Sequence, residues 1–277
     1  SHKSQEVIED ILDYLSGFYG KLSITRGDRH TYVGMDVSMP GDGSIEISMK
    51  SYLVEAIEVF PDELTADVAT PAALHLFEVN EDCEKLEESK RKLLHKIVAK
   101  LLYVATKGRP DIYVAIAFLT SRVAVADNDD CKKLKRLLNY IRCTIDMTLK
   151  LSAKSLTLAK WFVDAAYAVR DDYKSQSGVM MTMGTGAMLG KSTKQKGNSK
   201  SSTEAELMAA GDASSQIIWT KNFMEAQGYT TSTAILYQDN KSAILLEKNG
   251  RMSCGKNIKH INIRYFFITD YIKKGYI

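Results

Sequence analysis

The segment LTLAKWFVDAAYA, residues 156–168, decides the fold class of this chain of 277 residues. Residues 156–163 predict a β-strand, and Asp164 ends that strand with a carboxylate. Downstream, the pattern predicts strands at 177–183 and near Gly190, a long helix over 203–227, a fourth strand at 234–237, and helices over 240–248 and 258–274. This order of strands and helices predicts an α/β domain with a mixed sheet and flanking helices.

The first half of the sequence predicts a mostly helical architecture. Alternation of apolar and polar residues at 32–39 and 44–49 flanks the turn Pro40-Gly41-Asp42-Gly43, which predicts a small β-hairpin. Helical spacing of apolar residues predicts helices near the start (Val7 to Leu15) and over 50–59, 90–106, 111–125 and 131–145. We therefore expect two domains, residues 1–150 and residues 151–277.

The two halves differ in charge. Residues 1–150 carry 20 Lys and Arg against 24 Asp and Glu, a net charge of −4, whereas residues 151–277 carry 17 against 10, a net charge of +7. The second half is therefore the better candidate for contact with a polyanion such as nucleic acid.

Composition excludes several classes of protein. Apolar residues make up 45% and charged residues 26%, which is ordinary for a globular protein and excludes a wholly disordered chain. We expect no membrane span, which needs about 20 mostly apolar residues, and no signal peptide. The start lacks a methionine and looks cut from a longer chain. Four scattered cysteines without a C-x-x-C pair predict a reducing compartment, the cytoplasm or the nucleus, and no structural zinc.

Three acidic residues are placed where such a fold brings them together. Asp164 ends the first strand of the α/β domain and Asp239 ends the fourth. If these strands are parallel neighbours, both carboxylates lie at the same edge of the sheet. Glu206, in the first turn of the long helix, shares a face with Ala210 and Ala213 and should point toward the sheet, whereas Glu204 should point away.

Three convergent carboxylates repel one another unless a cation neutralises them. Their hard oxygen donors suit Mg²⁺ or Mn²⁺. Two such ions about 4 Å apart can activate a water and stabilise the leaving oxygen of a phosphodiester.

Structural alternatives exist for each acid. Thr203-x-x-Glu206 also matches a capping box, Asp239 can be the N-cap of the following helix, and Asp164 can simply terminate a strand. The lysines Lys191, Lys194, Lys196 and Lys200 either line a phosphate track or belong to a solvated hairpin. His260, among basic residues, is either a functional or a structural histidine.

Several motifs, in order along the chain, resemble one family. DAAY (164–167), KSQSG (174–178), STKQK (192–196), KSSTEAEL (200–207), YQDNKSAI (237–244) and KHINIRYFF (259–267) resemble the ribonuclease H region of copia-type LTR retrotransposon Pol polyproteins. Upstream, YVGM (32–35) resembles the strand after the polymerase active site, and TKGRPDI (106–112) resembles the thumb and connection motif of the same polyproteins.

The resemblance implies that the two halves of the chain correspond to two different domains of the polyprotein. Residues 1–150 would be the end of the reverse transcriptase palm with the thumb and connection, and residues 151–277 a ribonuclease H domain that cuts RNA in RNA–DNA hybrids. Asp164, Glu206 and Asp239 match the metal-binding acids, which would hold two Mg²⁺ or Mn²⁺. The partners implied are an RNA–DNA hybrid and the remainder of the Pol polyprotein. The nucleic-acid contacts expected are Lys191, Lys194, Lys196, Lys200, Asn240, His260 and Arg109.

Two departures from the family pattern limit these expectations. The chain has no Tyr-x-Asp-Asp motif, so we do not expect it to polymerise DNA by itself. The family continues past a glycine like Gly275 into a fifth strand and a final helix that carries a fourth metal-binding Asp. We therefore expect a sheet that lacks both elements and has an exposed edge. Two hypotheses follow: a metal-dependent ribonuclease H fragment, or a non-catalytic remnant that acts as a nucleic-acid-binding or interaction module.

Overall fold

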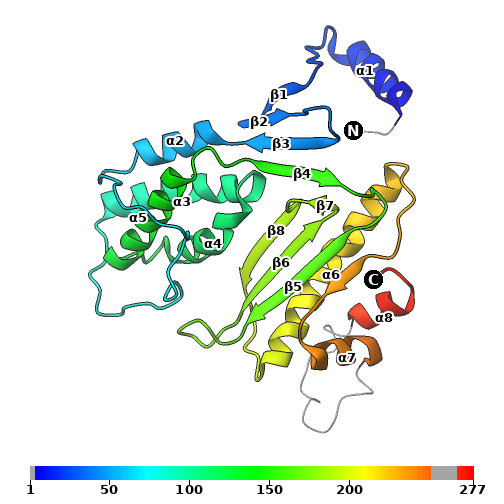
Figure 1. Cartoon of the computed structure of the whole chain (residues 1–277). Helices are drawn as coiled ribbons and strands as arrows, with labels where there is room; N and C mark the ends of the chain where they lie inside the picture. Colours follow the sequence, from blue (N-terminus) through cyan, green and yellow to red (C-terminus); the bar gives the residue numbers. More distant parts are fainter. Residues whose placement is uncertain (1–3, 251–266) are drawn as a thin grey trace.

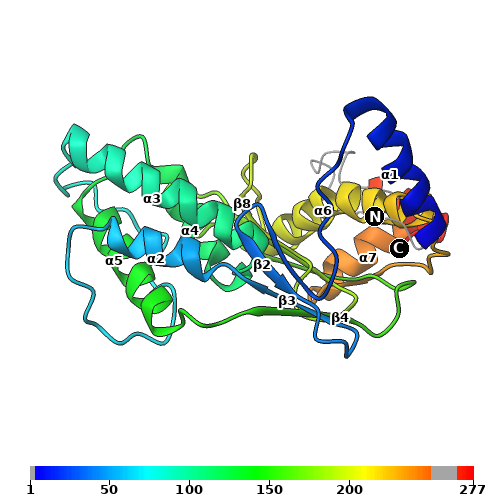
Figure 2. The ribbon, with the colours of Figure 1, turned by 90° about the horizontal axis from the view of Figure 1, so that it is seen from above.

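The computed structural model describes residues 4–250 and 267–277. The helices α2 to α5, within residues 50–143, form a helical region that lies beside a sheet covered by the long helix α6 (Ser202–Ala226), and strands β1 to β4, within residues 29–48 and 149–153, run above both in the view of Figure 1. Seen from above, the helices α2 to α5 group at one end of the molecule and α6 and α7 (Lys241–Asn249) at the other (Figure 2). Within the described residues, no helix has the length and apolar character that crossing a membrane requires.

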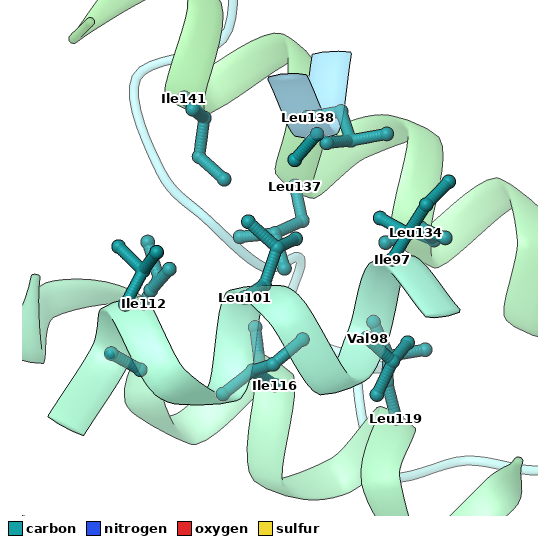
Figure 3. Packing of buried hydrophobic residues seen from close by; sticks show 14 of the residues in the cluster. Ile97, Val98, Leu101, Ile112, Ile116, Leu119, Leu134, Leu137, Leu138 and Ile141 are labelled. Carbon is teal, nitrogen blue, oxygen red and sulfur yellow. The ribbon is translucent and has the colours of Figure 1, made fainter. Parts of the chain in front are cut away.

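The helical region is built around α3 (Glu88–Lys107), which buries one apolar face. Ile97, Val98 and Leu101 on that face follow helical spacing and are at most 2% exposed. They pack against residues of η1 (Pro110–Ile112), α4 (Tyr113–Arg122) and α5 (Asn128–Cys143), as Figure 3 shows. Helix α2 (Lys50–Glu58) adds Leu53 and Ala56 to this core. The predicted helices are confirmed, except that the fourth begins as a short 3₁₀ turn at Pro110.

The first sheet contains the predicted hairpin and three strands that were not predicted. Its antiparallel order is β1 (Arg29–Tyr32), β2 (Met35–Ser38), β3 (Ser44–Ser48), β4 (Leu149–Ala153) and β7 (Gly184–Thr185). Gly34, between β1 and β2, has a positive φ of 75°, and a Cβ there would lie 2.1 Å from the Tyr52 ring. Only glycine therefore fits this turn. Helix α1 (Gln5–Tyr19) precedes the sheet, and none of its residues is buried.

The second sheet has the predicted mixed topology. Its order is β8 (Leu189–Lys194), β6 (Gln176–Thr182), β5 (Lys160–Ala166) and β9 (Ile235–Tyr237), with β9 parallel to β5. Helix α6 (Ser202–Ala226) covers one face, where Val163 packs with Ala210 and Ala213. The prediction for β5 was wrong at both ends, because this strand begins at Lys160 and continues to Ala166 beyond Asp164.

The opposite face of this sheet is partly covered by the helical region. Gly190 lies so close to η1 that a Cβ there would come within 3.3 Å of the Pro110 side chain. Further along the face, Phe162 and Tyr237 stay partly exposed and stack at 4.7 Å between ring centroids.

Two short helices follow β9 within the described residues. They are α7 (Lys241–Asn249) and α8 (Phe267–Lys273); of the helix predicted over 258–274, residues 258–266 lie outside the described residues. Beyond α8, Tyr276 O accepts a hydrogen bond from Ala234 N at 3.0 Å, and Gly275 O accepts one from Thr233 Oγ1 at 2.9 Å. Residues 275–277 therefore lie beside the start of β9, at the edge where a fifth strand was expected to be missing.

Candidate metal centre

Three carboxylates converge at one edge of the second sheet. Asp164 lies on β5, Asp239 follows β9, and Glu206 lies in α6. Each offers an oxygen atom, and these three atoms all lie within 4.8 Å of one another. The structure thus brings together the three acids that the sequence singled out, because β5 and β9 are parallel neighbours.

Glu206 is the buried member of the triad, with 5% of its surface exposed. Its Oε1 accepts a hydrogen bond from Ala165 N at 3.2 Å, and its Oε2 accepts one from Gln238 Nε2 at 3.1 Å. Burial raises the pKa of Glu206; these two hydrogen bonds lower it, and the charges of Asp164 and Asp239 raise it further. A carboxylate held so firmly beside two others is disposed to share a cation.

The capping role considered for Glu206 falls to other residues. The N-cap of α6 is Ser201, whose Oγ accepts a hydrogen bond from Glu204 N at 3.2 Å. In return, Glu204 Oε2 accepts a hydrogen bond from Lys200 N at 2.7 Å. Glu204 is 8% exposed and closes the helix start, and it is not among the three acids that converge. Glu206, two residues further on, is left to face Asp164 and Asp239.

Asp239 is likewise not a helix cap. The N-cap of α7 is its neighbour Asn240, whose Oδ1 accepts a hydrogen bond from Ala243 N at 3.0 Å. The Asn240 amide nitrogen lies 3.5 Å from Thr203 Oγ1, which joins the starts of α6 and α7. Asn240, expected as a nucleic-acid contact, is thus engaged in holding these two helix starts together, and Asp239 is exposed and available to the triad.

Asp164 faces an open part of the sheet. Its partner across the strand pair is Gly178, which has no side chain to cover it. A cavity of about 280 Å³ opens here between α4 and the sheet. Asp164, Phe162 and Tyr113 are among the residues that line it. The acid is therefore reachable from solvent, as a site for a bulky substrate requires.

The four predicted lysines lie on β8 and in the segment that leads to α6. Lys191, Lys194, Lys196 and Lys200 are all exposed, and Lys194 Nζ pairs with Asp172 at 2.6 Å. Their exposure leaves both interpretations of the segment open, a phosphate track or a solvated surface.

Buried polar residues between these lysines fix the segment. Gln195 Nε2 donates to Ser177 Oγ at 2.9 Å and to Ala205 O at 2.8 Å, and Ser199 Oγ lies 2.8 Å from Ser175 Oγ. These residues were missed at first. The alternation of Lys with Gln and Ser is the signal that could have identified them, because it separates an exposed from a buried side.

Arg109 does not reach a surface where nucleic acid could bind. It is 2% exposed, its Nη2 pairs with Asp111 Oδ2 at 2.8 Å, and its Nη1 donates to Thr144 O at 3.0 Å. The guanidinium also lies over the Tyr140 ring. This arrangement is a structural one that joins η1 to the end of α5, and it corrects the expected phosphate contact. His260 lies outside the described residues.

The donor set of the triad fits a divalent cation. All three groups are carboxylates, the ligands that Mg²⁺ and Mn²⁺ favour, and their oxygens are close enough to share one or two ions. Gln238, which the sequence reasoning did not single out, orients Glu206 from the residue just before Asp239.

Comparisons with known proteins show what this chain is similar to. No family model matches the chain. It is 29% identical over 231 residues to the retrovirus-related Pol polyprotein from transposon TNT 1-94 of Nicotiana tabacum, a match that covers 82% of this chain and 17% of that protein. It is also 29% identical over 251 residues to the corresponding protein from transposon RE2 of Arabidopsis thaliana, covering 90% of this chain and 17% of that one. The chain thus spans about a sixth of the length of these relatives.

A solved structure shows the same fold. The foamy viral protease-reverse transcriptase, determined in complex with an RNA/DNA hybrid, matches with a TM-score of 0.52 at 11% identity, over 100% of this chain and 33% of that one. Over most of its length the chain is therefore similar to part of the retrovirus-related Pol polyproteins of transposons, and it shares its fold with part of a viral protease-reverse transcriptase.

Proposed function

We propose that this chain cuts the RNA strand of RNA–DNA hybrids, as the ribonuclease H part of a retrotransposon Pol polyprotein. The observation that carries this proposal is the convergence of Asp164, Glu206 and Asp239 within 4.8 Å at the sheet edge. Because the chain has no Tyr-x-Asp-Asp motif, the proposal does not extend to polymerisation by this segment.

The three acids would hold two Mg²⁺ or Mn²⁺ ions. Such ions, when bound, supply a water of lowered pKa and stabilise the charge on the leaving oxygen of a phosphodiester. The chain itself orients the site. Ala165 N and Gln238 Nε2 fix both oxygens of Glu206, while the exposed Asp164 and Asp239 are free to meet ions from the solvent side.

The lysines supply the affinity for the substrate backbone. Lys191 is exposed on β8, and Lys196 and Lys200 are exposed on the segment between β8 and α6; all three would contact phosphates. Such contacts carry no sequence information, and recognition of a hybrid would rest on backbone shape and on the 2′-hydroxyl groups of the RNA strand. The other proposed partner is the remainder of the Pol polyprotein.

The test is cleavage of a hybrid with a labelled RNA strand, in Mg²⁺ and then in Mn²⁺. We expect the chain to cut and the Asp164→Asn variant to lose cleavage. A matched control is Asp212→Asn, which makes the same change at an exposed position of α6 that lies outside the triad. Cleavage that persists in Asp164→Asn refutes the site. Hybrid binding without cleavage in either metal would instead support the non-catalytic module.

A further inference from the structure

Arg170 is buried between the helical region and the sheet that carries the triad. Only 7% of its surface is exposed. It lies in the loop that joins β5 to β6, shortly after the strand that carries Asp164. It takes no part in the chemistry proposed above, so its burial needs another explanation.

The guanidinium bridges two parts of the structure. Its Nη2 and Nε donate to Gln176 Oε1 at 2.8 and 3.3 Å, and its Nη1 donates to Ser121 Oγ at 3.1 Å. Its central carbon lies 5.0 Å from the centroid of the Phe77 ring and 5.2 Å from that of Phe118. Gln176 begins β6, whereas Ser121 and Phe118 belong to α4.

All these partners are neutral groups. Hydrogen bonds and contacts with aromatic rings, rather than an ion pair, therefore offset the cost of burying the positive charge. Burial lowers the pKa of Arg170, and the charges of Asp172 and Asp171 only partly oppose this. Arginine suits such a place because its planar fork directs several hydrogen bonds at once and stacks on aromatic faces.

A short path leads from these contacts to the triad. Gln176 Nε2 donates to Ser192 Oγ on β8 at 2.8 Å, which ties β6 to β8. Across the strand pair Gln176 faces Ala166, and Asp164 lies on the same strand as Ala166, opposite Gly178. On the other side, Phe118 of α4 is 1% exposed in the helical core. One side chain thus connects that core with the strand pair that presents Asp164.

We propose that Arg170 is a positioning residue that holds the β5–β6 strand pair against α4 and thereby sets the place of Asp164 in the cation site. This proposal rests on the proposed function, because it takes the triad as a divalent-cation site. The helical region then governs the ion affinity of a triad whose three acids all lie in the second half of the chain.

The test measures Mn²⁺ binding to the full chain by isothermal titration calorimetry. We expect Arg170→Met to bind Mn²⁺ roughly tenfold more weakly, because packed residues that do not themselves contact a ligand can change its affinity by about this much. Arg170→Lys keeps the positive charge but loses the planar guanidinium, so its Mn²⁺ affinity should lie between those of the wild type and Arg170→Met. Ser121→Ala removes only the hydrogen bond from Arg170 to α4 and keeps the contact with the Phe118 ring, so it serves as a milder variant if Arg170→Met does not fold.

The matched control is Arg109→Met, which removes the other deeply buried arginine described above, whose contacts with Asp111, Thr144 and Tyr140 all lie within the helical region. It should lower thermal stability and leave the Mn²⁺ affinity unchanged. Equal affinity in the wild type and Arg170→Met overturns the positioning role. An equal loss of Mn²⁺ affinity in Arg109→Met also overturns it, because any destabilisation of the helical region would then be enough to weaken Mn²⁺ binding.

A second readout does not depend on the cation. Amide hydrogen exchange in the β5–β6 pair should become faster in Arg170→Met and stay unchanged in Arg109→Met. Unchanged exchange in Arg170→Met overturns the proposal. Failure of the proposed function is recognised separately by one of two results. Either the wild type does not bind Mn²⁺, or the Asp164→Asn variant binds it as well as the wild type does.

Discussion

Glu247 places a fourth carboxyl group in the interior near the triad. Its replacement by glutamine tests how much this buried group lowers the stability of the fold when it is ionised. The side chain lies on α7 with 4% of its surface exposed, and Oε1 has no hydrogen-bond partner among the described residues. Burial and, after it, the charge of Glu206 raise the pKa of Glu247 from 4.5 to about 7. Glu247→Gln keeps the shape of the side chain and removes the ionisation.

The size of the effect follows from this pKa. Raising a pKa from 4.5 to about 7 disfavours the ionised form in the folded state by about 3 kcal/mol, at about 1.4 kcal/mol per tenfold change. Below pH 4.5 the Glu247 carboxyl group is protonated in both the folded and the unfolded state, so it does not lower the stability of the fold. Between 4.5 and 7 the unfolded chain ionises first, so stability falls as the pH rises, and above 7 the full penalty remains.

The assay is urea unfolding in EDTA, followed by tryptophan fluorescence, at pH 5 and pH 8. We expect Glu247→Gln to be more stable than the wild type by about 3 kcal/mol at pH 8 and by much less at pH 5. Glu225→Gln is the control, because Glu225 is exposed and the hydrogen bond from Lys221 lowers its pKa, which reverses the sign. A glutamine variant of Glu247 that gains no stability at pH 8, or gains equally at both pH values, refutes the reasoning.

Three further predictions concern the site, the surface and the core. Gln238→Leu removes the amide that donates to Glu206 Oε2, so Mn²⁺ binding measured by calorimetry should weaken several-fold; unchanged affinity would show that Glu206 needs no such support. Lys196→Ala should weaken hybrid binding and reduce the slope of log K against log salt by about 1, and an unaltered slope would remove this lysine from the interface. Leu101→Ala, at a fully buried position of α3, should lower the free energy of unfolding by about 2–5 kcal/mol, and a loss below about 1 kcal/mol in urea unfolding would contradict the packing described.

Elements whose signal is local were predictable from the sequence. Helix α3 was predicted within two residues at its start and one at its end, because the apolar spacing of Ile97, Val98 and Leu101 is set within one helix. The hairpin of β2 and β3 follows from the turn at 40–43 for the same reason.

Elements that depend on distant partners were missed or misplaced. Strand β4 has only five residues, and its partner β3 lies about a hundred residues earlier in the chain, so no neighbouring residue indicates it. At the start of β5, the apolar residues Leu156 and Leu158 suggested a longer strand. The chain instead turns there, with Ser155 Oγ and Thr157 Oγ1 2.7 Å apart.

The candidate site shows the same division. The triad could be predicted because each acid follows a local pattern at the end of a strand or the start of a helix. Whether Glu206 and Asp239 are metal ligands or helix caps could not be predicted, because several nearby residues could have capped α6 and α7. The structure shows that Ser201 and Asn240 are the N-caps of these helices. Arg109 was misassigned because its acceptor Thr144 lies 35 residues away and only tertiary structure reveals it.

The strand β4 has a consequence for the order in which the chain can fold during synthesis. It pairs with β3 from the first half and with β7 from the hairpin between β6 and β8. The hairpin β2–β3 therefore leaves the ribosome with an unpaired edge that only much later residues can cover. Such an edge is a hazard for aggregation while it waits. Slow translation between residues 50 and 149 would lengthen that exposure, whereas rapid folding of α3 to α5, whose contacts are largely local, would bring β4 into place as soon as it emerges.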